Sequence, residues 1–364
     1  SSDLHVAEEL EREAFQIPLL IGGATTSRAH TAIRVEGCYS GPTVHVLDAS
    51  RAVGVVAKLL SIREKRGFVA RTREEYEQVR ERREGRRTRK ALLSLSEARR
   101  NPFPLDWATY NPPIPRTTEL QVLPDQPLVE LVDYIDWTPF FRTWELAGTY
   151  PRILADPIIG EAAQELFVDA ERMLEKIVAE GWIQAKAVIG FWPANTVADD
   201  DIEIYSDDSR QNVLAHIHTL RQQMEKRPGQ PNLALADFVA PRDTGIGDFV
   251  GAFAVTAGIG IDAHVARFEL AGDDYNAILF KALADRLAEA FAERMHERVR
   301  KEFWGYARDE TLDNEALINE RYSGIRPAPG YPACPDHTEK ETLFRLLDAT
   351  QMIGLQLTEN YAMI

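Results

Sequence analysis

The chain has 364 residues, of which 45% are hydrophobic and 27% are charged, and its formal net charge is −15. Nucleic-acid binding needs basic faces that neutralise phosphates, so this acidic balance predicts no nucleic-acid partner. No run of eighteen apolar residues is present, which predicts no membrane span and no membrane partner. The two cysteines, Cys38 and Cys334, lie far apart and form no disulfide framework, so we expect a reducing, cytoplasmic location.

The first sixty residues alternate between helical and strand-like patterns. The segments IPLLIGG and PTVHVLD are short apolar runs typical of buried strands, and VAEELEREAF, TTSRAHTAIRVE and SRAVGVVAKLL have helical spacing. This order predicts an α/β unit with parallel strands. Because two strands make too small a sheet, residues 1–61 are expected to be the end of a larger, Rossmann-like domain.

Residues 62–127 are expected to be a linker. Residues 62–100 are dense in Arg and Glu, which predicts a solvated helix with ion pairs between successive turns. The alternative is a basic strip that docks an acidic partner, centred on Arg82, Arg83, Arg86 and Arg87. Residues 101–127 are proline-rich and irregular, which is typical of a domain boundary.

Residues 128–364 are expected to form one α+β domain with a mainly antiparallel sheet and long helices. Helical spacing is found in GEAAQELFVDAERMLEKIVAE, VLAHIHTLRQQMEK, DDYNAILFKALADRLAEAFAERMHERVRKEFW, NEALINERY and HTEKETLFRLLDA. Strand-like runs are AKAVIGFWPAN, DDIEIYS, LALADFVA and DFVGAFAVTAG. These elements do not alternate as βαβ units do, which argues against a parallel sheet.

Several polar clusters are candidates for metal binding or catalysis. His216 with His218, and Cys334 with His337, lack the second ligand pair of a closed zinc site, so we expect no metal site. On the predicted helix, His216 and His218 would point to different faces. Residues 199–201 are three aspartates, which favour a turn before a strand over a cation site. No catalytic triad or nucleophile motif is present, so no catalytic residue is assigned.

The segment GIRPAPGYPACPDHTEK, residues 324–340, has four prolines between two predicted helices. Prolines fix φ and lower the entropy cost of holding a loop in one shape. Arg326 offers a planar fork for a carboxylate, Gly330 permits close approach, and Tyr331 can cover a flat or apolar group. The alternative is a stiff connector whose arginine binds helix carbonyls, and the residues alone leave both open.

Long segments of the chain resemble a known family. RPAPGYPACPDHTEK, YIDWTPFFRTWELAGTYPRIL, FWPANTVADDDIEIY, DFVAP and KALADRLAEAFAERMHERVRKEFWGYA resemble the activation domain of cobalamin-dependent methionine synthases. IPLLIGGATTSRAHTAIRVEGCYSGPTVHVLDASRAVGVV resembles the end of that family's cobalamin-binding domain. The resemblance covers essentially the whole chain, and it implies 128–364 as the activation domain, incomplete at its C-terminus.

The resemblance implies a function. In this family, S-adenosylmethionine and an electron from a flavodoxin-like reductase convert inactive cob(II)alamin to methylcobalamin, within an enzyme that moves a methyl group from methyltetrahydrofolate to homocysteine. Cobalt is then the nucleophile, so the protein's work is positioning and electrostatics. We expect the rest of the enzyme as a partner and a monomeric chain. The alternative is a non-catalytic docking module for a flavodoxin-like electron donor.

The resemblance also implies site residues. The family's RxxxGY motif falls on Arg326, Gly330 and Tyr331, and its S-adenosylmethionine-binding aspartate falls on Asp136. We expect Arg326 to take the methionine carboxylate and Asp136 the ammonium group. Ala328, which lies between two prolines, is a further candidate for a backbone contact. Glu289 and Glu320, on helices leading to the loop, are candidates as well.

For cobalamin, the resemblance points to Gly22, Gly23 and Ala49, which match positions along the cofactor's nucleotide tail. The residues alone leave the glycine pair open between a turn before a capped helix and a turn that lines a ligand. The family's cobalt-ligating DxHxxG motif is absent, as is a later segment with a tyrosine pair. We therefore expect most of the cobalamin contacts outside these residues.

Overall fold

The computed structural model describes residues 2–22, 27–46, 49–61, 63–88 and 92–364. The chain divides into two compact units, Ser1–Leu93 and Ser94–Ile364. The predicted linker 62–127 is therefore divided, since its charged helix belongs to the first unit and its proline-rich segment to the second. The Trp304 indole N–H, for example, donates to the Pro113 carbonyl at 2.8 Å within the second unit.

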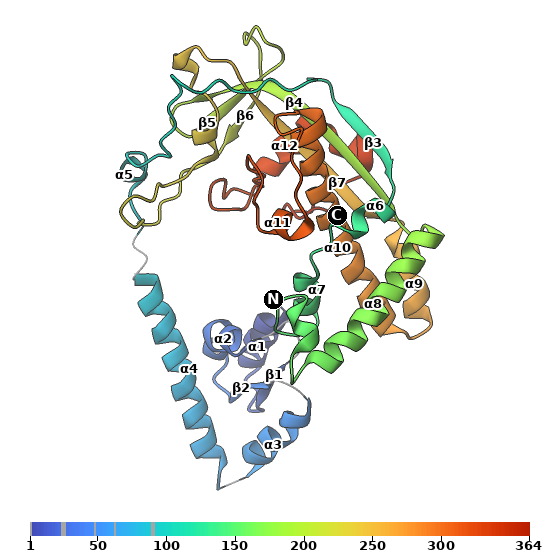
Figure 1. Ribbon diagram of the computed structural model, residues 1–364. Helices are drawn as coiled ribbons and strands as arrows, with labels where there is room; N and C mark the ends of the chain where they lie inside the picture. Colours follow the sequence, from blue (N-terminus) through green and yellow to red (C-terminus); the bar gives the residue numbers. More distant parts are fainter. Residues whose placement is uncertain (1, 23–26, 47–48, 62, 89–91) are drawn as a thin grey trace. The chain divides into compact units, whose positions relative to one another are not determined.

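The first unit is a small parallel strand pair with helices (Figure 1). Its strands pair in the predicted parallel sense, with Leu19 opposite Thr43 and Gly22 opposite Val46. The membership of this unit in a Rossmann-like domain stays a prediction. Its elements are α1 (Ser2–Arg12), β1 (Leu19–Gly22), α2 (Arg28–His30), a π-helical turn (Thr31–Val35), a 3₁₀ turn (Glu36–Cys38), β2 (Thr43–Val46), α3 (Ala49–Leu60) and α4 (Lys65–Thr88).

Two tyrosines fasten this small unit together. Tyr39 is buried, and its hydroxyl donates to the carbonyls of Phe15 and Ile17 at 3.1 and 2.6 Å. Tyr76 on α4 is also buried, and its hydroxyl accepts the His45 backbone N–H at 2.7 Å. The charged helix α4 is therefore packed on the strands rather than fully solvated. The predicted docking strip, 82–87, lies among residues whose side chains are outside the described part of the chain.

The second unit contains one sheet and most of the helices (Figure 1). Its strands are β3 (Gln121–Gln126), β4 (Gln184–Val197), β5 (Asp201–Tyr205), β6 (Val213–His218) and β7 (Asp248–Ile259). Its α-helices are α5 (Leu95–Ala98), α6 (Val129–Val132), α7 (Trp137–Thr143), α8 (Gly160–Glu180), α9 (Ile261–Leu270), α10 (Asp274–Arg298), α11 (Asn314–Ile318), α12 (Glu339–Leu347) and α13 (Ala349–Ile353). A π-helical turn, Val299–Phe303, extends α10, and 3₁₀ turns cover Arg152–Ala155, Leu235–Phe238 and Arg242–Thr244.

The sheet is antiparallel throughout, as predicted. The long strand β4 pairs with β7 along most of its length, from Gln184 opposite Ile259 to Ala194 opposite Asp248. Its other side pairs with β3 near its start and with β5 near its end. β6 continues the sheet beyond β5. A central strand with neighbours on both sides satisfies its backbone groups and is accordingly buried along nearly its whole length.

Alternate residues of β4 face two different cores, because strand side chains point to opposite faces with a period of two. Ala187, Ile189 and Phe191 belong to the core that α8 and α10 cover. Val188 and Trp192 belong to the core that α12 and α13 cover. Each large side chain buried in this way contributes about 1.5–3 kcal/mol. The sheet thus has helices on both faces, and the segment leading to α12 connects one layer to the other.

Three element predictions for the second unit were wrong. The connector 101–127 was expected to be irregular, but its residues Gln121–Gln126 form the strand β3. VLAHIHTLRQQMEK begins with the strand β6, not a helix, because Ala215 and Ile217 are buried while the residues between them are exposed, which is the alternation of a strand. LALADFVA contains the 3₁₀ turn Leu235–Phe238 instead of a strand. There, the Asp237 carboxylate accepts the Ala234 backbone N–H at 3.0 Å and turns the chain.

Candidate functional site

The proline-rich loop between α11 and α12 is held in a defined turn. The Gly330 backbone N–H donates to the Cys334 carbonyl at 2.8 Å, and the Cys334 N–H donates to the Tyr331 carbonyl at 2.9 Å. Gly330 has φ +104°, and an added Cβ would lie 2.2 Å from the His337 ring carbon Cε1. The backbone conformation therefore favours glycine at this position, and an alanine would also displace the exposed His337 ring.

Arg326 leaves this loop and pairs with Glu293 on α10. The pair joins the guanidinium Nη2 to the carboxylate Oε1, and the two side chains are 25% and 19% exposed. Arg326 Nε and Glu293 Oε2 are both buried and have no protein partner. The alternative that Arg326 binds helix carbonyls is therefore not what the structure shows. The two side chains are joined by a single hydrogen bond, and each keeps a polar atom that forms no hydrogen bond.

Three further polar side chains surround this pair. His296 is 3% exposed, and its ring lies edge-on against Tyr322 with centroids 4.7 Å apart. Burial, together with the positive charges of Arg300 and Arg326, lowers the pKa of His296 to about 3. Arg300 is fully buried, with Nε and Nη2 donating to Glu310 at 2.9 and 2.6 Å. Its guanidinium carbon lies 4.4 Å from the centre of the Tyr322 ring.

Sequence reasoning missed four residues of this cluster, namely Glu293, His296, Arg300 and Tyr322. Glu289, Glu293, His296 and Arg300 are spaced by four, three and four positions, which places them on one face of the helix. The same helix carries further charged residues, among them Asp285, Arg286 and Glu297, so this spacing alone does not single out a site. The predicted Glu289 lies on this face, as expected from its place on α10.

Glu320 differs from the prediction in one respect. It was expected on a helix, but α11 ends at Ile318 and Glu320 has φ +53° in the turn that follows. The buried Glu293 carboxylate has a raised pKa, chiefly because of burial, and the negative charges of Glu289 and Glu320 raise it further while Arg326 and Arg300 lower it. Both predicted glutamates are therefore near Arg326's partner.

Asp136 is placed at the start of α7. Its carboxylate caps the helix by accepting the Thr138 backbone N–H at 2.9 Å. It lines an open groove of about 1320 Å³ between α6, α7, α8 and α11, with Trp137, Tyr150 and Phe167 among the aromatic walls. Arg326 is not among the residues that line this groove. The short helix α11 lines the groove along its length, from Asn314 to Ile318, and Glu320 follows two residues after its end.

The remaining loop residues differ in their exposure to solvent. Tyr331 is 67% exposed, and Ala328 is exposed as well. Cys334 is buried at 1% exposure, and burial raises its pKa to about 11, so the thiol is protonated at neutral pH. Cys334 therefore packs as a small apolar residue, while His337 stands beside Gly330.

His216 and His218 were expected to point to different faces of a helix, and the structure corrects this expectation. Since β6 is a strand, His216 and His218 lie on the same face, with ring centroids 6.3 Å apart. His216 is 3.4 Å from the Glu203 carboxylate, and His218 is 3.0 Å from the Asp201 carboxylate. Within the described residues, no group of three or more His, Cys, Asp or Glu side chains is arranged to hold a metal ion.

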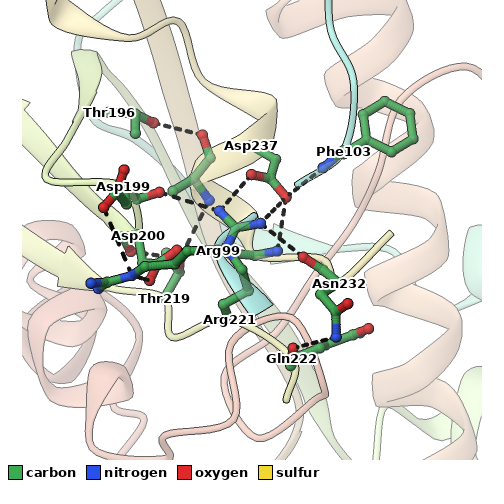
Figure 2. A network of polar contacts seen from close by, with 12 residues as sticks. Arg99, Phe103, Thr196, Asp199, Asp200, Thr219, Arg221, Gln222, Asn232 and Asp237 are labelled. Atoms are coloured by element: carbon green, nitrogen blue, oxygen red, sulfur yellow. Dashed lines mark hydrogen bonds and ion pairs between the residues drawn. The ribbon is translucent and has the colours of Figure 1, made fainter. Parts of the chain in front are cut away.

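Asp199 and Asp200 lie in the predicted turn before β5, and Asp201 is the first residue of that strand. Figure 2 shows Arg221 between Asp200 and Asp237. The guanidinium donates to Asp200 at 2.8 Å and to Asp237 at 2.7 and 2.8 Å. Asp200 also accepts from Arg99 at 2.6 Å, and Asp237 accepts the Phe103 backbone N–H at 3.3 Å, so this network connects the start of the proline-rich segment to the sheet.

The positions expected to contact cobalamin are described only in part. Gly22 ends β1, and an added Cβ there would lie 3.0 Å from the Val46 carbonyl oxygen. Gly23 lies outside the described residues, and Ala49 begins α3 without a described side chain. Of the helices in the described part of the chain, none has the length and apolar character of a membrane span.

Comparisons with known proteins bear on the second unit. Residues 127–364 match the family described as vitamin B12 dependent methionine synthase, activation domain. A crystal structure of the MetH reactivation domain bound to AdoHcy is 54% identical in sequence, with a TM-score of 0.71. That match covers 75% of this chain and 83% of the other. The antiparallel sheet with long helices is thus the fold of that domain, and the chain belongs to the family of vitamin B12 dependent methionine synthase activation domains.

Proposed function

We propose that this chain binds S-adenosylmethionine and supports the reductive methylation of cob(II)alamin to methylcobalamin, as part of a methionine synthase that transfers methyl from methyltetrahydrofolate to homocysteine. The observation that carries this proposal is Arg326. It stands on a rigid loop with an unused, buried N–H donor, in a domain whose 54% identical relative holds AdoHcy. AdoHcy is S-adenosylmethionine without the methyl group.

The residues divide the recognition of the ligand between them. A guanidinium suits a carboxylate, so Arg326 takes the methionine carboxylate, and the Asp136 carboxylate takes the ammonium group. Gly330 brings the loop backbone close to the ligand, with Ala328 and Tyr331 beside it. Glu289 and Glu320 add negative charge, which favours a ligand that carries an ammonium and a sulfonium.

Cobalamin, when bound, supplies the cobalt that accepts the methyl group. The fit of the first unit to this cofactor is weak, because the space beside Gly22 faces the Val46 carbonyl rather than an open cradle. We therefore assign no step of the reaction to residues 1–61. The one electron that cob(II)alamin needs comes in this proposal from a flavodoxin-like reductase, which with the rest of the enzyme is the partner of a monomeric, cytoplasmic chain.

Calorimetric titration with S-adenosylmethionine tests the proposal. The wild-type chain should bind saturably, and Arg326→Ala should weaken binding by about tenfold to a hundredfold, since a hydrogen bond to a charged group contributes about 1.5–3 kcal/mol. Arg345→Ala, which removes an exposed arginine on α12, is the matched control and should bind as the wild type does.

A flat titration of the folded wild-type chain would contradict the proposal. Retained affinity for a flavodoxin-like protein in that case would favour the alternative, a docking module that does not bind the ligand. Equal loss in Arg326→Ala and Arg345→Ala would remove Arg326 from the site while leaving ligand binding itself in place.

A further inference from the structure

The Arg326–Glu293 pair joins the proline-rich loop to the packed helix α10. Glu293 stands on α10, whose Leu287, Phe291 and Met295 are fully buried in the larger core. Arg326 stands on the loop after α11. A packed helix restricts the position of its carboxylate, so the pair determines where the Arg326 guanidinium lies.

The pair is incomplete in a way that an ordinary structural ion pair is not. A carboxylate and a guanidinium usually form two parallel hydrogen bonds. Here, only Nη2 of Arg326 donates to Glu293, while Arg326 Nε and Glu293 Oε2 are buried without a protein partner. A buried donor without an acceptor is costly, by about 1–3 kcal/mol, unless a ligand or water supplies the missing bond.

Charges of both signs act on Glu293: those of Arg326 and Arg300 favour its ionised form, and those of Glu289 and Glu320 oppose it. His296, three residues along α10, packs against Tyr322. Arg326 keeps an unused Nε donor beside this cluster.

We propose that Glu293 is a positioning residue: it holds Arg326 by one nitrogen so that the remaining N–H donors meet the carboxylate of the incoming ligand. This inference rests on the proposed function, because it assigns Glu293 to the same site. Glu293 does not touch the ligand. Its effect is confined to the part of the affinity that depends on the ligand's carboxylate.

The experiment uses two probes, S-adenosylmethionine and its decarboxylated analogue, which lacks the methionine carboxylate. The full chain is titrated with each, as wild type, Glu293→Gln, Glu293→Ala and Arg326→Ala. Glu302→Ala is the matched control, since Glu302 pairs with Arg298 at 2.8 Å at the end of the same helix, away from the loop.

The wild type should prefer S-adenosylmethionine. Glu293→Ala should lose about tenfold in affinity for S-adenosylmethionine, as expected for one lost charge-assisted bond, and bind the decarboxylated analogue unchanged. Glu293→Gln keeps an acceptor oxygen and should lose less. Arg326→Ala should abolish the preference, and Glu302→Ala should leave both affinities as in the wild type.

Other outcomes overturn the inference. An equal loss for both probes in Glu293→Ala, or a shifted unfolding midpoint that accounts for the loss, would make Glu293 a structural residue. A preference that survives Glu293→Ala would overturn the positioning role while the proposed function stands. A folded wild type that binds neither probe would overturn the proposed function and this inference with it.

Discussion

Two arginines of the second unit, Arg221 and Arg326, are bound to carboxylates in opposite ways. Arg221 is 2% exposed and uses its whole guanidinium, which has five N–H donors. Its bonds go to the carboxylates of Asp200 and Asp237 and to the carbonyls of Asp199 and Asn232, at distances of 2.7–3.3 Å (Figure 2). No donor is left for a ligand.

Arg326 has the opposite character. It is 25% exposed, makes one charge-assisted bond to Glu293, and keeps a buried Nε without a partner. If Arg326 binds the ligand as proposed, this difference separates a structural arginine from a binding one when both stand beside carboxylates. The completeness of the hydrogen bonding decides, because a satisfied guanidinium stabilises the fold and an unsatisfied one can bind a further acceptor.

The largest effect is expected at the satisfied arginine. Arg221→Ala removes the paired arginine from the buried Asp237 carboxylate, leaves the buried Asp200 with Arg99 alone, and should lower the free energy of unfolding by about 3–5 kcal/mol. Chemical denaturation measures this change. Arg326→Ala is the comparison variant and should cost less than about 1 kcal/mol, because its pair is partly exposed and joined by a single hydrogen bond.

A small decrease in the free energy of unfolding of Arg221→Ala, or equal decreases in Arg221→Ala and Arg326→Ala, would contradict the division between a structural and a binding arginine. The ligand affinity of the folded fraction of Arg221→Ala should equal that of the wild type.

The cluster around Arg326 is also expected to respond to acid. The pKa of His296 is lowered from 6.5 to about 3, so the folded chain keeps this ring neutral where the unfolded chain protonates it. The stability that depends on this ring is present above pH 6.5 and is lost as the pH falls toward 3. At pH 5 the loss should be about 2 kcal/mol.

Chemical denaturation gives the free energy of unfolding of the wild type and of His296→Gln at several values between pH 7 and pH 5. The difference between the two slopes of this free energy against pH measures the contribution of His296. Parallel slopes for the two proteins would show that His296 titrates normally and that the cluster is open to water.

The smallest effect is expected in the loop backbone. Gly330→Ala places a methyl group at φ +104° and 2.2 Å from the His337 ring, and should cost about 1–2 kcal/mol in stability. Gly229→Ala is the matched control, since Gly229 has φ +83° but no atom within 4 Å of an added Cβ.

Thermal unfolding and ligand titration should both show a larger effect for Gly330→Ala than for Gly229→Ala. If the two glycine variants behave alike and bind S-adenosylmethionine equally, the loop around Gly330 does not cradle the ligand.

Much of the fold could be predicted from local pattern. The runs that became β4 and β7 are apolar, and α8 and α10 repeat their apolar residues at helical spacing, so their burial is visible in the sequence. The segment at β6 was assigned wrongly because its alternation spans only six residues and is followed by LRQQMEK, which has helical composition.

The site could be predicted only where a backbone signal marks it. Four prolines and Gly330 identify the loop, and Arg326 stands out within it. Glu293 could not be separated by composition from the other glutamates of α10, since its role depends on a partner 33 residues away. The same holds for Arg221, whose carboxylates come from two different turns.

A crystal structure of this chain with S-adenosylmethionine tests the central claim most directly. We expect the ligand's carboxylate within hydrogen-bond distance of the Arg326 guanidinium, with the Gly330 turn beside the ligand and Glu293 still bound to Nη2. A ligand bound elsewhere in the second unit, or one whose carboxylate lies away from Arg326, would contradict it.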